Sequence, residues 1–286
     1  QNSAIAPADG LLYAIRDVTG TIDSIPLITA SIISKKAAEG LGSLVLDVKC
    51  GSAAFMKTLD DATELAKSMV GAAKGLGINT VAQITEMDYP IGKYVGNGLE
   101  IIGSIEVLQG KGSRDTFELV NLQCQELLVK SGKASSHSNA EFLIQEVIAN
   151  GEALTKFQEM CIMQGVPEAT AQQLMDNPNG VLKSSQQITE ITADDTGFLQ
   201  SIDSMTLANI ARKHGAGRYR IEDEVVPEIG FEIMAQRGAK INKGDTWLKF
   251  HHNEYLTDEE VAKLTDSLKL SNQKVTVNSR LIHIVD

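Results

Sequence analysis

The chain has 286 residues, of which 43% are hydrophobic and 22% are charged, and its formal net charge is −11. This composition is typical of a folded globular protein, and no apolar run approaches the roughly 20 residues that a membrane span needs. The acidic balance disfavours nucleic acid, whose binding depends on Lys and Arg that neutralise phosphates, so we expect neither a nucleic-acid nor a membrane partner.

The segment from Tyr13 to Lys36 carries the clearest signal of a site. Ser24 precedes Pro26, which predicts an N-cap followed by a helix that starts with proline. Four residues of that helix recur at spacings of three and four and so share one face: Ile28, Ser31, Ile32 and Lys35. We expect Arg16 to lie on an upstream loop that brings its donors to the same place. Apolar walls and fixed donors of this kind suit a flat, carbonyl-rich ring.

The next elements predict a β–α–β unit. Residues 43–49 form a short, β-branched-rich run typical of a buried parallel strand. Residues 59–76 are predicted to be a helix that ends at Gly75 and Gly77, and residues 78–84 are the next predicted strand. The order strand, helix, strand indicates a parallel sheet.

The middle of the chain is mainly helical. After a loop that contains Gly96-Asn-Gly98, helices are predicted over residues 99–108, 117–130, 139–149 and 153–164. The polar stretch 167–185 predicts a crossing between subdomains.

The last hundred residues are mainly β. Strands are predicted at residues 187–191, 197–202, 231–234 and 245–251, with a turn from Gly238 to Gly244, and residues 274–284 are mostly β-like. Ser204 is expected to cap a helix that runs to about His214, and Thr257 to cap another over residues 259–268.

Metal and disulfide signals are weak. Cys50, Cys124 and Cys161 lack CxxC spacing, which predicts reduced thiols in a cytoplasmic protein. The pair His251-His252 would point to opposite faces of a strand, and we expect surface residues rather than ligands there. The sequence therefore predicts no metal site.

The Tyr13–Lys36 segment closely resembles the pyrimidine-binding segment of the thymidine phosphorylase and pyrimidine-nucleoside phosphorylase family. This resemblance implies that Arg16, Ser31 and Lys35 hydrogen-bond the base. It also implies apolar walls for the ring, made by Ile22, Ile28, Ile32 and Phe55. The motifs Asp47-Val-Lys49, Gly51, Ala53-Ala-Phe-Met56 and Gly215-Ala-Gly-Arg218 resemble further family motifs, so the likeness covers nearly the whole chain.

The resemblance implies an α/β fold in three parts. Residues 1–40 would be the remnant of a helical lobe with the base-binding segment, and residues 41–185 the parallel-sheet α/β lobe. Residues 186–286 would form a C-terminal β-rich α+β subdomain.

The implied activity is phosphorolysis of thymidine or other pyrimidine nucleosides to the free base and a sugar 1-phosphate. Arg16 and Lys35 would be the catalytic residues, since they could hold the negative charge that accumulates on the departing ring. The resemblance implies phosphate as co-substrate, no cofactor, and a homodimer for the complete protein. It leaves the choice between thymidine and uridine open.

Two family features have no match in the sequence. The family's Gly-rich phosphate loop lies N-terminal to the segment where this chain begins, and no other glycine pattern has the spacing of a phosphate loop. We therefore expect the chain to supply the base-recognition half of the site and to be inactive alone. Some relatives bind a cation through a Glu where this chain has Gly103, so we expect no cation there.

Two other functions are compatible with the sequence. The chain could be a non-catalytic pyrimidine-binding or structural protein derived from the same fold. A phosphoribosyltransferase of the same superfamily is disfavoured, because diphosphate transfer needs an acidic metal site that the sequence lacks.

Overall fold

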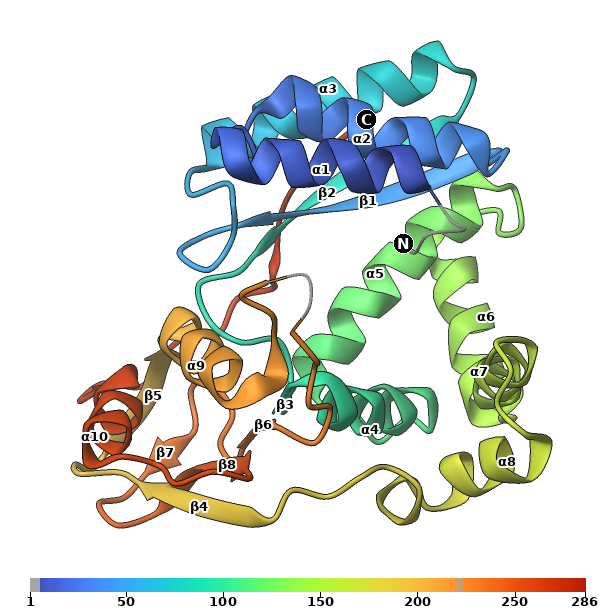
Figure 1. The fold of residues 1–286 in the computed structure, drawn as a ribbon. Coiled ribbons are helices and arrows are strands. Elements are labelled where there is room, and N and C mark those ends of the chain that lie inside the picture. Colours follow the sequence, from blue (N-terminus) through green and yellow to red (C-terminus); the bar gives the residue numbers. More distant parts are fainter. Residues whose placement is uncertain (1–5, 221–222) are drawn as a thin grey trace. The chain divides into compact units, whose positions relative to one another are not determined.

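The computed structural model describes residues 6–220 and 223–286, in which a β–α–β unit is followed by a run of five helices and then by mainly β structure (Figure 1). The residues group into two compact units. The first unit contains residues 1–87, 121–142 and 280–286, and the second contains residues 88–120 and 143–279. These units follow the packing of the chain, and the expected domain boundaries after residues 40 and 185 remain a prediction.

A three-stranded sheet forms the centre of the first unit, in the order β1-β2-β10. Strands β1 (Ser43–Cys50) and β2 (Asn79–Glu86) run parallel along their whole length, while β10 (Leu281–Val285) pairs with β2 in the antiparallel direction. Every residue of β2 from Thr80 to Thr85 is buried, as is usual for the central strand of a covered sheet.

Helix α3 (Leu59–Gly75) connects β1 to β2 and confirms the predicted β–α–β unit. Its first turn is stabilised by Thr58, whose side chain accepts a hydrogen bond from the backbone N–H of Asp61. The helix ends before Gly77, whose positive φ of 80° is the usual termination by glycine. Its apolar face joins the core of the sheet through Ala62, Leu65, Ala66, Met69, Val70 and Ala73.

Two further helices lie on the same side of the β1–β2 sheet as α3, namely α1 (Pro7–Thr19) and α2 (Ile25–Ala38) (Figure 1). Ser24 occupies the N-cap of α2 and proline follows in the first turn, as predicted, although the Ser24 side chain makes no capping hydrogen bond. The sequence analysis places Arg16 on a loop, and this is wrong, because Arg16 lies in the last turn of α1.

Antiparallel sheets form the core of the second unit, in the orders β3-β6-β8-β4 and β7-β5-β9. The rings of Phe231 and Phe250 stack with centroids 4.4 Å apart, and Trp247 is fully buried beside them in the same cluster. The strands are β3 (Tyr94–Val95), β4 (Gln187–Thr192), β5 (Gly197–Ile202), β6 (Gly230–Ile233), β7 (Lys240–Ile241), β8 (Thr246–His252) and β9 (Leu268–Ser271).

The remaining helices lie between residues 97 and 267. They are α4 (Asn97–Leu108), α5 (Arg114–Lys130), α6 (His137–Ala149), α7 (Glu152–Met163), α8 (Glu168–Asp176), α9 (Ser204–Ala211) and α10 (Asp258–Ser267), with a 3₁₀ turn at Pro178–Gly180 and a π turn at Arg212–Ala216. None of the helices in the described ranges is both long and apolar enough to cross a membrane.

A close backbone crossing explains the predicted Gly96-Asn-Gly98 turn. A Cβ atom at Gly96 would lie 2.5 Å from the carbonyl oxygen of Ile229, and one at Gly230 would lie 2.3 Å from that of Val95. Gly96 also has a φ of 132°, a conformation that other residues rarely adopt. Glycine therefore lets the β3–α4 turn pass directly against β6.

Three predicted elements differ from the structure. The polar stretch 167–185 contains helix α8, whose buried residues Ala171, Leu174 and Met175 share one face within a polar composition. The predicted turn after Gly238 contains β7, and the β-like region 274–284 forms a strand only from Leu281. The mixed α/β class itself, with a parallel unit followed by antiparallel sheets, is confirmed.

Candidate functional site

The predicted base-binding residues lie on two helices of the first unit. Arg16 is on α1, while Ser31 and Lys35 are one turn apart on α2. The spacing of four residues places the two α2 side chains on one face, as predicted, and the Lys35 ammonium lies 2.9 Å from the Ser31 hydroxyl.

Asp9 of α1 joins this pair. The Ser31 hydroxyl donates to Asp9 Oδ1 at 2.7 Å, and the Lys35 ammonium donates to Asp9 Oδ2 at 2.9 Å. Lys35 also donates to the backbone carbonyl of Ser31 at 2.5 Å. The three N–H groups of the ammonium are therefore all engaged within one small cluster, which we call the Asp9 cluster: Asp9, Ser31 and Lys35.

The charges of this cluster favour an ionised Asp9. Hydrogen bonds from Lys35 and Ser31 lower the pKa of Asp9 below its ordinary value of 3.8, and the nearby Arg16 guanidinium acts in the same direction. The carboxylate is largely buried, with 16% of its side chain exposed, while the Lys35 side chain is 34% exposed. The ammonium is thus held in place at the end of a side chain that is partly exposed.

Arg16 is 8% exposed and ties the end of α1 to the start of α2. Its guanidinium donates to the backbone carbonyls of Thr21 and Leu27, each at 3.4 Å, and to that of Ile22 at 2.5 Å. These bonds use three of its five N–H groups. The guanidinium also lies over the ring of Tyr13, with its central carbon 5.6 Å from the centroid.

The four predicted apolar wall residues have different surroundings. Ile28 and Ile32 are partly buried and pack against the core of the first unit. Ile22 is partly exposed in the connection between α1 and α2. Phe55 is 71% exposed on the loop that follows β1. Their role as walls for a ring remains a prediction.

The sequence analysis missed Asp9, the acceptor at the centre of this cluster. It also missed the helix that carries Asp9, although two ordinary helix-start signals were present. Pro7 opens α1 and Asp9 lies in its first turn, where acidic side chains favour the helix dipole. Only the packing of α1 against α2 brings Asp9 close to Ser31 and Lys35, which follow it in the sequence by 22 and 26 positions.

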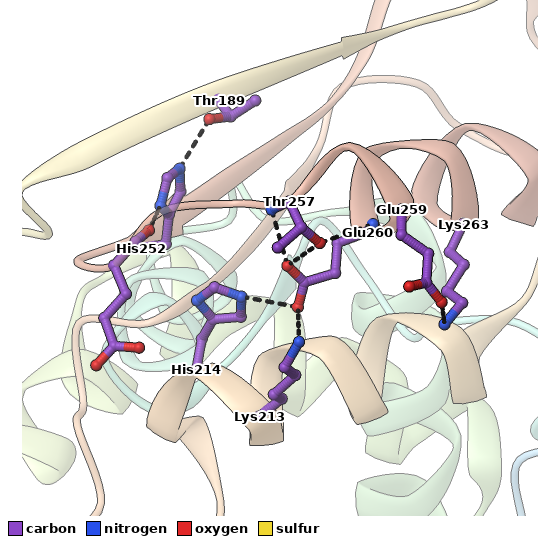
Figure 2. Close-up of polar contacts among 9 residues, drawn as sticks. Thr189, Lys213, His214, His252, Thr257, Glu259, Glu260 and Lys263 are labelled. Atoms are coloured by element: carbon purple, nitrogen blue, oxygen red, sulfur yellow. Dashed lines mark hydrogen bonds and ion pairs between the residues drawn. The ribbon is translucent and has the colours of Figure 1, made fainter.

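A second cluster of titratable side chains lies in the second unit, around Glu260 of α10 (Figure 2). Glu260 Oε1 accepts from Lys213 at 2.8 Å and lies 3.2 Å from the Nε2 of His214. Its Oε2 accepts from the backbone N–H and the hydroxyl of Thr257, which completes the capping box at the start of α10.

The environment of Glu260 keeps its carboxylate charged. Burial alone raises the pKa of Glu260, but hydrogen bonds from Lys213, Thr257 and His214 outweigh that effect and lower the pKa from 4.5 to about 2. The side chain is 6% exposed. The cluster links the π turn to α10 and has the geometry of a structural ion pair, in which a buried carboxylate meets a lysine whose side chain is 61% exposed.

The two adjacent histidines both lie on β8, which extends one residue beyond the predicted strand 245–251, and the expectation that they are surface residues is wrong. His252 is 1% exposed and forms 2.7 Å hydrogen bonds with the Thr189 hydroxyl and the Glu254 carbonyl (Figure 2). The His251 side chain is 17% exposed, and its burial lowers its pKa below 6.5. Hydrogen bonds to the protein occupy both ring nitrogens of His252.

No group of three or more His, Cys, Asp or Glu residues within the described ranges is arranged to hold a metal ion. At Gly103, where the sequence analysis expects no cation ligand, the space beside the backbone is filled. A Cβ atom there would lie 2.9 Å from Cδ2 of Tyr94, whose hydroxyl donates to Glu106. A longer side chain at this position would displace the tyrosine ring.

Comparison with known proteins gives two matches to protein families. Residues 1–154 match the family described as glycosyl transferase family, a/b domain. Residues 198–271 match the pyrimidine nucleoside phosphorylase C-terminal domain. These matches cover the parallel β–α–β unit with the Asp9 cluster and most of the antiparallel sheets, so the chain is a member of the glycosyl transferase family, a/b domain, that carries this C-terminal domain.

Individual relatives agree with the family matches. The chain is 38% identical over 283 residues to the pyrimidine-nucleoside phosphorylases of Staphylococcus aureus (strain USA300) and Bacillus subtilis (strain 168). Each alignment covers 99% of this chain and 64% of the relative, so the chain spans just under two thirds of the length of these proteins. The chain belongs to the pyrimidine-nucleoside phosphorylase family.

Proposed function

We propose that this chain is the base-recognition part of an enzyme that cleaves thymidine or another pyrimidine nucleoside by phosphorolysis. The observation that carries this proposal is the pair formed by Ser31 and Lys35, which lie 2.9 Å apart on one face of α2 in a chain of this family. Both side chains are polar, partly exposed and held by the same carboxylate, as a rigid recognition surface requires.

In the proposed reaction, an oxygen of phosphate forms a bond to C1′ of the sugar while the bond from C1′ to N1 of the base breaks. The bonding electrons remain on the ring and spread over its carbonyl oxygens, and the ring then takes a proton. Lys35 and Arg16 would stabilise that negative charge, and Ser31 would orient the ring. Charge stabilisation by one such donor is typically worth about 10²- to 10³-fold in rate.

The phosphate site would come from outside this chain, since the family resemblance implies a Gly-rich phosphate loop N-terminal to residues 1–286. The first experiment therefore joins residues 1–286 to the N-terminal segment of the B. subtilis relative, to which the family resemblance assigns phosphate binding, and measures release of thymine from thymidine and phosphate. We expect turnover from the joined protein and none from the chain alone. The homodimer belongs to the same proposal and is checked by light scattering on the joined protein.

The role of Lys35 is tested by the variant Lys35→Ala of the joined protein, with Lys36→Ala as the matched control. Lys36 is the neighbouring lysine of α2 and pairs with Glu39 at 2.9 Å. We expect Lys35→Ala to lower kcat/KM by about 10²-fold or more and Lys36→Ala to change it less than about twofold. Unchanged turnover in Lys35→Ala would remove Lys35 from the mechanism. Thymine release by the unjoined chain would contradict the division of the site.

A further inference from the structure

The hydrogen bonds of the Asp9 cluster determine which way the Ser31 hydroxyl points. A hydroxyl has one proton to donate and two lone pairs that accept. Because an ionised carboxylate only accepts, the 2.7 Å contact with Asp9 Oδ1 uses the Ser31 proton. The Lys35 ammonium, which only donates, uses one lone pair of the same oxygen at 2.9 Å. Ser31 can therefore offer a ligand only a lone pair and no proton.

The pair thus has a defined polarity, with an acceptor at Ser31 and a donor at Lys35. A 4-oxo pyrimidine such as uracil or thymine has the complementary pattern on its edge, since N3–H donates and the adjacent O4 accepts. A 4-amino pyrimidine such as cytosine has the reverse pattern, because N3 accepts and the amino group donates. Against this pair, cytosine would place its N3 lone pair opposite the Ser31 lone pair and its amino group opposite the Lys35 ammonium.

We propose that Asp9 is a specificity-determining, positioning residue, which fixes the polarity of Ser31 and Lys35 and so selects 4-oxo over 4-amino pyrimidines. This inference rests on the proposed function, in which Ser31 and Lys35 hold the base. A ring O4 would replace the Lys35 contact with Ser31 Oγ, while the contacts with Asp9 and the Ser31 carbonyl keep the ammonium in place. A site that pairs each polar group of its ligand rejects an analogue that leaves those groups unpaired.

The variant Asp9→Asn turns Ser31 from an acceptor into a donor toward the ligand, with little change in the shape of the side chain at position 9. An amide has one accepting oxygen and a donating NH₂ group. Because Lys35 can only donate, it takes the amide oxygen, and the NH₂ group then faces Ser31 Oγ and donates to it. The Ser31 proton becomes free to point toward the ligand, where it matches the N3 lone pair of cytosine.

The experiment measures the dissociation constants of uracil and cytosine with the 286-residue chain by NMR titration. We expect the original chain to bind uracil at least about tenfold more tightly than cytosine, as one unsatisfied hydrogen bond of about 1.4 kcal/mol implies. In Asp9→Asn the ratio of the cytosine dissociation constant to the uracil dissociation constant should fall to about one or below. The ratio is decisive, because a merely structural role of Asp9 would weaken both ligands alike.

Two controls complete the design. Asp60→Asn makes the same change at an exposed position in the first turn of α3 and should keep the original ratio. Ser31→Ala removes the acceptor, so the uracil preference should be lost without any gain for cytosine, which tests the inference even if Asp9→Asn does not fold. An unchanged ratio in either Asp9→Asn or Ser31→Ala overturns the inference. Binding of uracil by the original chain would still support the proposed function in that case. If the original chain binds neither base, the proposed function fails, and the inference fails with it.

Discussion

At the scale of single residues, Glu260 illustrates how a buried carboxylate stays ionised. Its two oxygens take part in contacts with Lys213, His214 and Thr257, and its side chain is 6% exposed. The pKa of Glu260 is lowered from 4.5 to about 2. A carboxyl group whose pKa is lower in the folded than in the unfolded state stabilises the fold above its unfolded pKa. This stabilisation is lost as the pH falls from about 4.5 toward 2.

We therefore predict that Glu260→Gln lowers the free energy of unfolding of the second unit by about 2–3 kcal/mol at pH 7. The difference from the original chain should shrink as the pH is lowered from 4.5 toward 2, because the original carboxylate is then protonated as well. Urea unfolding followed by the fluorescence of Trp247 measures this, since it is the chain's one tryptophan and is fully buried in the second unit.

The neighbouring Glu259 provides the matched control for this measurement (Figure 2). It lies on the same first turn of α10 but is exposed, with Lys263 as its partner at 2.6 Å. Glu259→Gln should change the free energy by less than about 1 kcal/mol, as for most surface ion pairs. An equal loss in both variants would show that the effect comes from the charge near the helix start and not from the buried contacts.

At the scale of elements, the starts of α2 and α9 show that a residue typical of an N-cap does not always form the capping hydrogen bond. Ser24 is the predicted N-cap of α2 and occupies that position, yet its side chain makes no capping hydrogen bond. The predicted cap of α9 is Ser204, whereas the structure uses Asp203. Its carboxylate accepts from the backbone N–H groups of Met205 and Thr206, at 3.0 and 3.2 Å. Both adjacent residues are good capping types, so the sequence alone could not distinguish them.

Asp203→Ala should therefore lower the free energy of unfolding by about 1 kcal/mol, the usual contribution of an N-cap, while Ser24→Ala should leave it almost unchanged. Urea unfolding followed by circular dichroism compares the two variants under the same conditions. A loss in Ser24→Ala equal to that in Asp203→Ala would mean that Ser24 caps α2 in solution.

At the scale of the whole molecule, the last residues of the chain pack with the N-terminal part of the sequence. Residues 280–286 belong to the first unit, where β10 pairs with β2, almost two hundred positions earlier in the chain. Val285 joins the core of that unit, and Asp286 pairs with Lys130 and Lys74 at 2.7 and 3.3 Å. The last strand thus completes a sheet whose other strands are formed before residue 87.

Deletion of residues 281–286 should therefore destabilise the first unit, while the second unit keeps its stability. Hydrogen exchange of the β2 amides should become at least about tenfold faster, because the strand loses a hydrogen-bonded neighbour and the apolar contact of Val285. The urea midpoint reported by Trp247 should stay unchanged. Asp286→Asn, which removes only the ion pairs, is the control and should leave β2 exchange within about twofold. Faster exchange in the control alone would contradict this explanation.

Several parts of the fold could be predicted because their signals are local. The run after Ser43, the glycines that end α3 and the N-cap at Thr257 depend on neighbouring residues, and each predicted element is present. Helix α8 was not predicted, because its apolar residues are few and its composition resembles a loop. The burial of His252 was not predicted either, since it depends on Thr189, a residue of another strand.

The sequence by itself determined the mixed α/β class, the parallel β–α–β unit and the shared face of Ser31 and Lys35, because each follows from residue spacing within a helix or strand. Only the tertiary structure decided that Arg16 lies on a helix, that Asp203 is the working cap, and that Asp9 holds the Ser31–Lys35 pair. The contacts of Asp9 with Ser31 and Lys35 join two helices, α1 and α2. The packing of these helices depends on the core beneath them and not on the spacing of residues along the chain.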